Sequence, residues 1–388
     1  MRKYFLTLIF LAQLSFLAYS QEEIVIGEKH NIYSEVLNEE RTYWVSLPES
    51  YSNNASDYKT YPVLILLDGN IHFNFIAGMV QYHSADRNRS LKIPEMIVVG
   101  IQNVDRRRDF TPDKIITVRE NNTGGGDRFL SFLEKELIPE IDKKYRTEPY
   151  RILYGHSLGG LLATHAYLKE NTLFNSFLAI DPSFGTWDAQ TMDQKLESIS
   201  PQTFQRYIYF ATANWGKQNL TNRDRHVRFY ESLNRLYEGT LRARLDYFEN
   251  ESHASVPPIA FLQGITTIYE GYGISFREIK TIDQLNGHFQ GISDRLGYKV
   301  NPPETLVNQV GYAFIRSNDE NEKMKGLDFF LLNTQNFPGS FNAFDSLGEA
   351  YEAVEDTTNA ILGYKRSLEL NPENEHAKSR ILILQEEN

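Results

Sequence analysis

The stretch Gly155-His156-Ser157-Leu158-Gly159-Gly160 stands at the junction of two segments of different character. Residues 151–154 form a short run typical of a strand, and residues 158–169 are small and apolar, as in a buried helix. A serine flanked by glycines at a strand-to-helix junction can form a sharp turn that lifts the hydroxyl above the sheet, at the positive end of the helix. This context predicts a nucleophile elbow with Ser157 at its tip, and a purely structural glycine turn is the alternative.

Strand-like and helix-like segments alternate along the chain on both sides of this turn. The predicted strands are residues 41–47, 61–67, 96–101, 151–154, 176–180, 207–213 and 244–248, and the predicted helices are residues 127–145, 158–169, 226–237 and 259–269. Residues 63–67 are apolar throughout, as is usual for strands that are buried on both faces of a parallel sheet. The alternation predicts an α/β fold, with a mostly parallel sheet and helices on both of its faces.

The pattern changes after residue 272. Residues 273–303 are weakly periodic and predict a linker with one short helix, whereas residues 304–388 are helical throughout. The spacings of a tetratricopeptide unit are matched by Phe344, Leu347, Gly348, Tyr351, Ala360, Tyr364 and Pro372. We therefore expect a main α/β domain in residues 21–272 and a small all-α, tetratricopeptide-like domain in residues 304–388. Its helices are expected to lean on the main domain or on another subunit, because arrays of this kind usually need at least three repeats.

The N-terminus has the features of a signal peptide. Arg2 and Lys3 precede the apolar residues 4–17, and Ala18-Tyr19-Ser20 offers a cleavage site before Gln21. The apolar run is shorter than the ~20 residues that span a bilayer. We therefore expect residues 1–20 to be removed and the protein to be periplasmic or secreted, with no membrane span.

Charge and cysteine content exclude several classes of protein. The chain has 40 basic and 51 acidic residues, a formal net charge of −11, and it contains no cysteine. Nucleic-acid binding along a phosphate backbone requires clustered positive charge, which is missing here. Disulfides, thiolate metal sites and a thiol nucleophile are excluded by the lack of cysteine.

A serine hydroxyl needs an adjacent base to act as a nucleophile, and histidine is the usual one. His253 is the best-placed histidine, because it follows the last predicted strand, where this fold carries its base. The acid that orients the base is expected after residues 207–213, but residues 214–219 contain no carboxylate. The first acid beyond them is Asp224, which could instead be a helix N-terminal carboxylate. Asp224 is the predicted acid, Glu251 is the second candidate, and a serine–histidine dyad is the third possibility.

An oxyanion hole requires two N–H donors near the nucleophile. One is expected from the backbone of Leu158, the residue after the serine, and the other from the turn after an early strand. Gly69 or Asn70 is the candidate for the second donor, because the turn Asp68-Gly69-Asn70 directly follows the apolar run that ends at Leu67.

Several motifs together resemble the putative-esterase branch of the α/β-hydrolase superfamily, over roughly residues 30–272. They are Leu66-Leu67-Asp68-Gly69, Arg107-Arg108-Asp109-Phe110-Thr111-Pro112, Gly125-Gly126-Asp127-Arg128-Phe129, Gly155-His156-Ser157-Leu158-Gly159-Gly160-Leu161, Asp181-Pro182-Ser183 and His253-Ala254-Ser255-Val256-Pro257. The chain is most similar to the ferric-siderophore esterases of the enterobactin and salmochelin kind. This resemblance implies an α/β-hydrolase fold, with Ser157 as nucleophile and His253 as base.

Three further residues are candidates for substrate contacts. Arg107 and Arg108 could clamp an anionic or catecholate substrate at the mouth of a pocket, or form a solvated turn with local ion pairs. Trp187 could form a wall of the acyl pocket, or pack in the core.

Together these features predict an exported serine esterase that hydrolyses carboxylic esters through an acyl-enzyme on Ser157, without a metal or an organic cofactor. The expected partner is a small-molecule or carbohydrate-linked ester of siderophore, feruloyl or simple acyl type. One alternative is an inactive hydrolase fold that binds a protein partner, or self-associates, through its C-terminal helices. The other alternative is an acyltransferase.

Overall fold

The computed structural model describes residues 23–52, 59–85, 91–115, 122–169, 173–187, 189–198, 206–214, 216, 221–236 and 242–386. The predicted signal peptide, residues 1–20, lies outside this part of the chain. No helix within the described ranges is long and apolar enough to cross a membrane.

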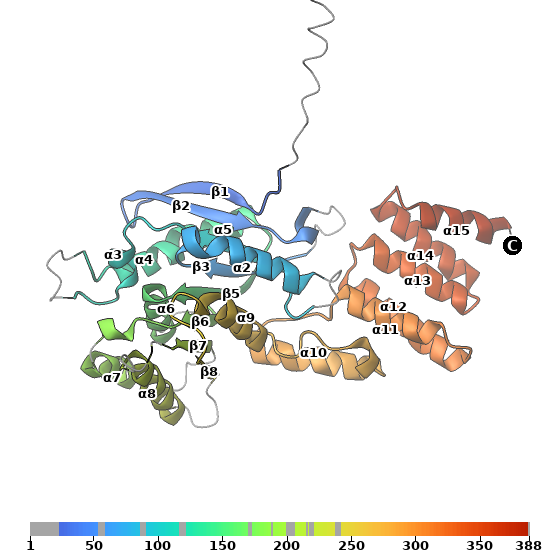
Figure 1. The fold of residues 1–388 in the computed structure, drawn as a ribbon. Coiled ribbons are helices and arrows are strands. Elements are labelled where there is room, and N and C mark those ends of the chain that lie inside the picture. The colour runs from blue at the N-terminus through green and yellow to red at the C-terminus, as the bar shows by residue number, and fades with distance from the viewer. Residues whose placement is uncertain are drawn as a thin grey trace, which may run out of the picture.

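One sheet forms the centre of the larger part of the molecule (Figure 1). In the described residues it has eight strands in the order β1-β2-β4-β3-β5-β6-β7-β8. The strands are β1 Glu28–Ser34, β2 Glu39–Ser46, β3 Tyr61–Leu66, β4 Ile97–Ile101, β5 Thr147–His156, β6 Ser176–Ile180, β7 Tyr207–Ala213 and β8 Ala243–Phe248. β2 pairs antiparallel with β1 and β4, and every other pairing is parallel. The structure therefore confirms the predicted α/β class.

The central strands are buried on both faces, because their side chains pack into two separate hydrophobic cores, one on each side of the sheet. In β3, Val63 and Ile65 belong to one core and Leu64 and Leu66 to the other. This follows from the two-residue period of a strand, which sends successive side chains to opposite faces. A strand between two cores must be apolar at every position, as β3 is.

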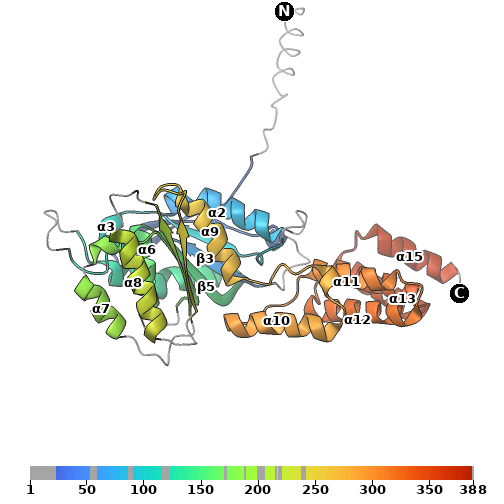
Figure 2. The same cartoon turned by 60° about the horizontal axis from the view of Figure 1, so that its bottom comes forward.

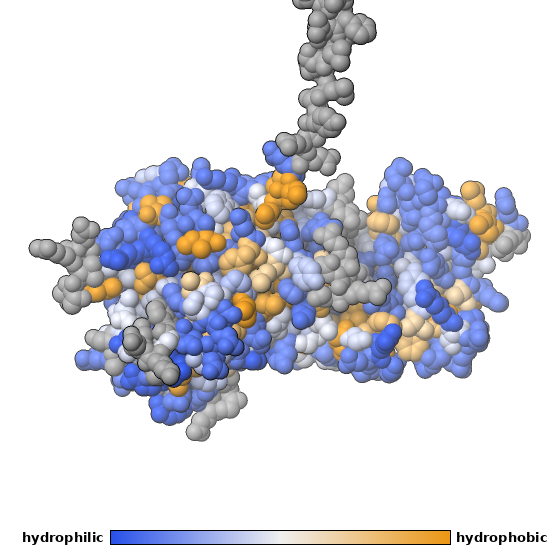
Figure 3. Space-filling model, in the orientation of Figure 1, coloured by the Kyte–Doolittle hydropathy of each residue, from blue (hydrophilic) through white to orange (hydrophobic). Residues whose placement is uncertain are grey.

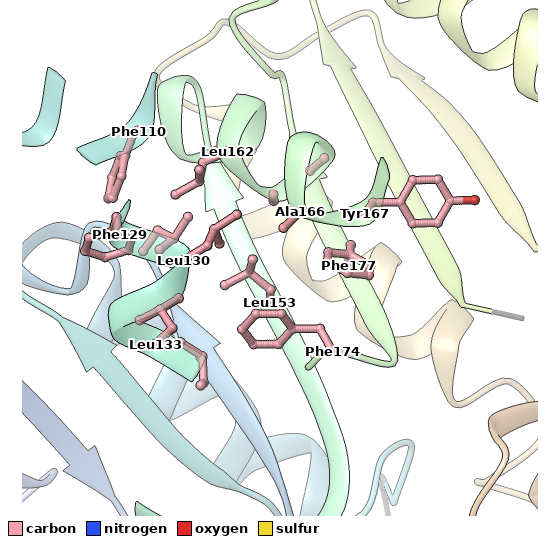
Figure 4. Packing of buried hydrophobic residues seen from close by; sticks show 14 of the residues in the cluster. Phe110, Phe129, Leu130, Leu133, Leu153, Leu162, Ala166, Tyr167, Phe174 and Phe177 are labelled. Atoms are coloured by element: carbon pink, nitrogen blue, oxygen red, sulfur yellow. The ribbon is translucent and has the colours of Figure 1, made fainter. Parts of the chain in front are cut away.

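Helices cover both faces of the sheet. The first face is covered by α4 Gly126–Phe132, α5 Ile138–Lys144, α6 Leu158–Leu168 and α8 Thr221–Leu236. Figure 4 shows how Leu162 and Ala166 of α6 pack with Leu153 of β5 and Phe177 of β6. The other face is covered by α2 Gly69–Ser84 and α9 Val256–Ile268. The short helices α3 Arg106–Phe110 and α7 Ala189–Glu197 complete this part.

The C-terminal part consists of helices beside the sheet (Figures 1 and 2). They are α10 Ile282–Leu296, α11 Glu304–Ile315, α12 Glu320–Asn336, α13 Phe341–Ala353, α14 Thr357–Leu370 and α15 Glu375–Glu386. The hairpins α11–α12 and α13–α14 are built alike, because Gly311 lies against the ring of Phe330 and Gly348 against the ring of Tyr364. The structure thus contains a repeated helical hairpin, and its tetratricopeptide identity stays a prediction.

The segment predicted as a linker contributes more to the core than expected. α10 has 15 residues, and its Leu285, Phe289 and Ile292 belong to the same core as β3 and α9. Just after α10, the ring of Tyr298 stacks on that of Tyr150 of β5, with the ring centroids 4.5 Å apart. Val307 of α11 and Phe329 of α12 belong to this core as well, so the first helices of residues 304–388 lean on the main domain, which is one of the two arrangements that the sequence suggested.

Candidate active site

Ser157 lies at a strained turn between β5 and α6. Its backbone has φ 60° and ψ −117°, a conformation that non-glycine residues rarely adopt and that is typical of functional sites. The turn requires glycine at position 155, because a Cβ there would lie 2.1 Å from the carbonyl oxygen of Gly159. The side chain of Ser157 is consequently presented at the N-terminal end of α6, as the sequence predicted.

His253 lies on the loop between β8 and α9, and a buried carboxylate holds its ring. Nδ1 of His253 is 2.5 Å from Oδ2 of Asp181, whose side chain is fully buried. The other oxygen, Oδ1, accepts a hydrogen bond from the N–H of Ala213, at 3.1 Å. A carboxylate–imidazole contact at Nδ1 favours the tautomer in which Nδ1 carries the proton and Nε2 carries the lone pair that a base requires.

The environment of Asp181 keeps its carboxylate ionised. Burial alone would raise its pKa, but the hydrogen bond from His253, the nearby ring of His226 and the N–H of Ala213 outweigh burial and lower the pKa below its usual value. The negative charge can therefore stabilise a proton on His253.

The structure corrects the predicted position of the acid. Asp224 is exposed on the first turn of α8, and the carboxylate on His253 comes from Asp181. Asp181 directly follows β6, which pairs with β5 and thus ends beside Ser157. Glu251, the second candidate, accepts a hydrogen bond from the N–H of Asn214 through its backbone carbonyl. The sequence prediction placed the acid after residues 207–213, whereas the structure has it after residues 176–180, where Asp181-Pro182 is a turn signal that directly follows a predicted strand.

Two further histidines support this arrangement. His156 donates from Nε2 to the carbonyl oxygen of His253, at 2.9 Å, and the two ring centroids are 4.4 Å apart. Burial, and next the charge of His253, lower the pKa of His156 to about 4, so this ring stays neutral near pH 7. His226 donates from Nε2 to the carbonyl of Pro182, at 2.6 Å, and burial lowers its pKa as well. His156 thus fixes the backbone of His253, and His226 fixes the backbone of Pro182, the residue after Asp181.

The turn that carries Gly69 and Asn70 lies next to the elbow. α2 begins at Gly69, shortly after the end of β3, and Asp68 is the residue just before it. Gly159 of the elbow lies close to Asp68, because a Cβ on Gly159 would be 3.3 Å from Oδ2 of Asp68. Arg106 joins the two segments, because it binds both oxygens of Asp68, at 2.6 and 2.9 Å, and the carbonyl of His156, at 3.3 Å. The first N–H groups of α2 and α6 lack partners within their helices, as at every helix start. The structure thus brings Leu158, Gly69 and Asn70 to the same edge of the sheet.

The three candidate substrate contacts lie in different environments. Arg107 is exposed. Arg108 is bound by Glu39 of β2, at 2.5 and 3.0 Å, and by Asp109, at 2.7 Å. Its guanidinium therefore serves local ion pairs, which was the structural alternative, and the clamp prediction is wrong for this residue.

Trp187 is a core residue rather than a pocket wall. It is 2% exposed, stacks on Phe184 with ring centroids 5.5 Å apart, and donates from Nε1 to Asp113, at 2.9 Å. A ring buried on this scale packs the core, so the prediction of a substrate contact is wrong here too.

Among the described residues, one cluster has the ligand types of a metal site. Asp345 and Glu349 of α13 and His376 of α15 have potential ligand atoms within 4.8 Å of one another. Nδ1 of His376 is hydrogen-bonded to Asp345, at 2.9 Å, so the cluster already links α13 to α15 without an ion.

A serine at a strand-to-helix elbow, with a histidine and an aspartate that follow it in the order of the chain, on a mostly parallel sheet, defines an α/β-hydrolase. The family model described as putative esterase matches residues 34–235, more than half of the 388 residues. The chain belongs to this family, and it is a carboxylic ester hydrolase.

Individual relatives and solved structures are similar to this chain over most of their own length. The ferri-bacillibactin esterase BesA of Bacillus subtilis (strain 168) is 30% identical over 244 residues, which cover 57% of this chain and 83% of the relative. An IroE-like serine hydrolase from Shewanella oneidensis is 28% identical with a TM-score of 0.69, over 78% of this chain and 98% of that one. An uncharacterised protein from Capnocytophaga ochracea DSM 7271 is 19% identical with a TM-score of 0.60, and it shares the fold over 93% of this chain and 99% of its own.

Proposed function

We propose that this esterase works through an acyl-enzyme on Ser157, with His253 as general base and Asp181 as the acid that orients it. The observation that carries the proposal is the 2.5 Å contact between Asp181 and Nδ1 of His253, which favours the tautomer with a basic lone pair on Nε2. The lack of a carboxylate in residues 214–219 counts in favour of the alternative of an inactive hydrolase fold. Asp181 removes that objection, because it supplies the third member from another loop.

In the first half of the reaction, Nε2 of His253 takes the proton of Ser157 Oγ as Oγ attacks the ester carbonyl carbon. The tetrahedral oxyanion is then stabilised by the N–H of Leu158 and by an N–H of Gly69 or Asn70. The protonated His253 delivers its proton to the leaving alcohol. In the second half, His253 activates the water that releases the acid.

The proposed substrates are siderophore-type esters. The support comes from BesA, a ferri-bacillibactin esterase that matches this chain over 83% of its own length. We further propose that the protein acts outside the cytoplasm, because residues 1–20 have the pattern of a cleaved signal peptide.

The test compares the protein from Gln21 onward with Ser157→Ala. Each is incubated with p-nitrophenyl acetate, p-nitrophenyl butyrate and a fluorophosphonate probe. We expect turnover and labelling of the wild type and loss of both in the variant. Absence of turnover and of labelling in the wild type would contradict the serine mechanism.

Substrate class is tested by kcat/KM on a catecholate siderophore trilactone, a feruloylated polysaccharide and the two p-nitrophenyl esters. We expect the trilactone to give the highest value. A higher kcat/KM on the feruloylated polysaccharide would overturn the siderophore assignment and leave the serine mechanism intact.

A further inference from the structure

One short turn contacts both Ser157 and His253. Asp181, Pro182 and Ser183 follow β6, and Asp181 holds the imidazole as described above. Ser183 lies against the nucleophile, because its Oγ is 3.0 Å from Oγ of Ser157. The N–H of Ser183 also donates to the carbonyl oxygen of Ser157, at 3.0 Å. A single turn thus fixes the distance of a second hydroxyl from the reacting oxygen.

The turn itself is rigidly held. Asp181 has φ 42°, a strained value for a residue other than glycine, and its N–H donates to the carbonyl of Ala211, at 2.8 Å. The carbonyl of Pro182 accepts hydrogen bonds from the buried His226, at 2.6 Å, and from Asn222, at 3.2 Å. Contacts of this kind keep Ser183 in place independently of its own hydroxyl.

The proposed mechanism decides which of the two serines donates. When the proton of Ser157 points to Nε2 of His253, Oγ of Ser157 has only lone pairs to offer to Ser183. Ser183 must then be the donor. This inference rests on the proposed function, since it requires Ser157 to be the nucleophile.

We propose that Ser183 is a fourth catalytic residue, whose hydroxyl donates a hydrogen bond to Ser157 Oγ and assists the departure of that oxygen during deacylation. Water attacks the acyl carbon and gives its proton to Nε2 of His253. The bond between the acyl carbon and Oγ then breaks, its electron pair goes to Oγ, and the proton on Nε2 is transferred to Oγ. Ser183 donates to Oγ throughout and keeps its own proton.

The contribution of Ser183 should differ between the two halves of the reaction. In the acyl-enzyme, Oγ is an ester oxygen and a poor acceptor, whereas in the departing state it gains negative charge. Hydrogen bonds to charged acceptors are stronger than those to neutral ones, so the bond from Ser183 strengthens as Oγ leaves. During attack, a hydrogen-bond donor on Oγ makes the hydroxyl easier to deprotonate, which speeds acylation. The same donor makes the oxygen less nucleophilic, which slows acylation, so the two effects partly cancel. Deacylation should therefore depend on Ser183 more than acylation does.

The test measures both steps for the wild type and for Ser183→Ala, with p-nitrophenyl acetate as substrate. We expect deacylation to slow about tenfold, the effect of one strengthened hydrogen bond, and acylation to change by less than about threefold. Mass spectrometry should detect acetyl-enzyme during turnover of the variant, together with a burst of p-nitrophenol. Ser183→Thr, which keeps the hydroxyl, should restore deacylation.

The control is Ser198→Ala, because Ser198 is exposed and its hydroxyl donates to the carbonyl of Lys195 in the same helix region, so this change should leave both steps unchanged. Equal losses in the two steps, or no loss in either, would overturn the role of Ser183. If Ser183→Ala does not fold, Ser183→Cys keeps the size with a weaker donor and must still slow deacylation selectively. A wild type without turnover and without fluorophosphonate labelling would instead refute the proposed function itself.

Discussion

Asp181 combines a strained backbone with a fully buried carboxylate, and both features have a cost. A buried carboxylate is stable only when its oxygens are paired, and here Nδ1 of His253 and the N–H of Ala213 pair them. The positive φ of Asp181 costs about 1–3 kcal/mol on the general scale for such residues. Strain and burial at one residue are typical of a position whose geometry serves the site.

The first prediction at the residue scale concerns Asp181→Asn. The amide keeps the shape but loses the charge that stabilises protonated His253, so kcat should fall about 10³- to 10⁴-fold. Asp224→Asn is the matched control, because the exposed Asp224 should tolerate the same change within about twofold. Initial rates with p-nitrophenyl butyrate measure both. A comparable loss in the two variants, or a larger loss for Asp224→Asn, would contradict the assignment of the acid.

Sequence reasoning pointed to Ser157 and His253 of the candidate site but not to Asp181. Ser157 and His253 lie in local patterns, a glycine-flanked turn and the loop after the last strand. Asp181 depends on which strands are neighbours, because β6 ends beside the elbow only through its pairing with β5. The contact between Ser183 and Ser157 depends on the same pairing of β5 with β6. Contacts that arise from sheet order are not visible in spacing along the chain.

At the scale of the elements, the elbow depends on how closely α6 approaches β5. A Cβ at Gly155 would lie 2.1 Å from the oxygen and 2.2 Å from the carbon of the Gly159 carbonyl. Both are backbone atoms, so no side-chain rotation can relieve the clash. The glycine is required by packing between two segments, in addition to any conformational freedom that it gives the turn.

The second prediction therefore compares Gly155→Ala with Gly78→Ala. Gly155→Ala should lower the free energy of unfolding by about 3 kcal/mol or more and abolish hydrolysis. Gly78 lies in α2 with no atom within 4 Å of a Cβ, so Gly78→Ala should stabilise by about 0.5–1 kcal/mol. Urea denaturation and initial rates check both variants. If Gly155→Ala kept the wild-type free energy of unfolding, α6 could move away from β5 without a loss of stability, and the packing argument would be wrong.

The elements that sequence reasoning located best are those with uniform burial. The strands β6 and β7 lie at the predicted residues 176–180 and 207–213, because both are buried almost throughout. β1 was missed because it is an edge strand with mostly exposed or half-buried side chains. α2 was missed because Asn70, His72 and Asn74 interrupt its apolar positions, although His72 is buried.

At the scale of the whole molecule, the two parts of the chain share one core but not the other. The core on the α2–α9 face extends through α10 into α11 and α12, where it includes Val307, Val310 and Phe329. Two separate clusters of the described residues lie outside this core: one joins α11 and α12 to α13, and the other is built around Tyr364. On the face seen in Figure 3 the surface is mostly hydrophilic, with scattered hydrophobic patches. α11 and α12 therefore stabilise the esterase part, whereas α13 packs on α11 and α12 and α14 and α15 pack around Tyr364, outside the shared core.

The last prediction separates these two roles with Tyr298→Ala and Gly348→Ala. Tyr298 stacks on Tyr150 of β5, and its hydroxyl donates to that of Tyr269, at 3.4 Å. Loss of this ring should destabilise the esterase part by about 2–3 kcal/mol, which is less than the loss of a fully buried aromatic ring costs, because Tyr298 is only partly buried. Hydrogen exchange should then accelerate in β5, α9 and α10 together.

Gly348→Ala should act only locally. The Cβ of an alanine at position 348 would lie 2.6 Å from the ring of Tyr364. This ring is fully buried, and its hydroxyl donates to Glu352. Because the ring cannot swing away freely, we expect faster hydrogen exchange in α13 to α15 and unchanged hydrolysis of p-nitrophenyl butyrate. If Gly348→Ala also accelerated exchange in β5, or if Tyr298→Ala left β5 and α9 unaffected, the shared core would not be what joins the C-terminal helices to the esterase.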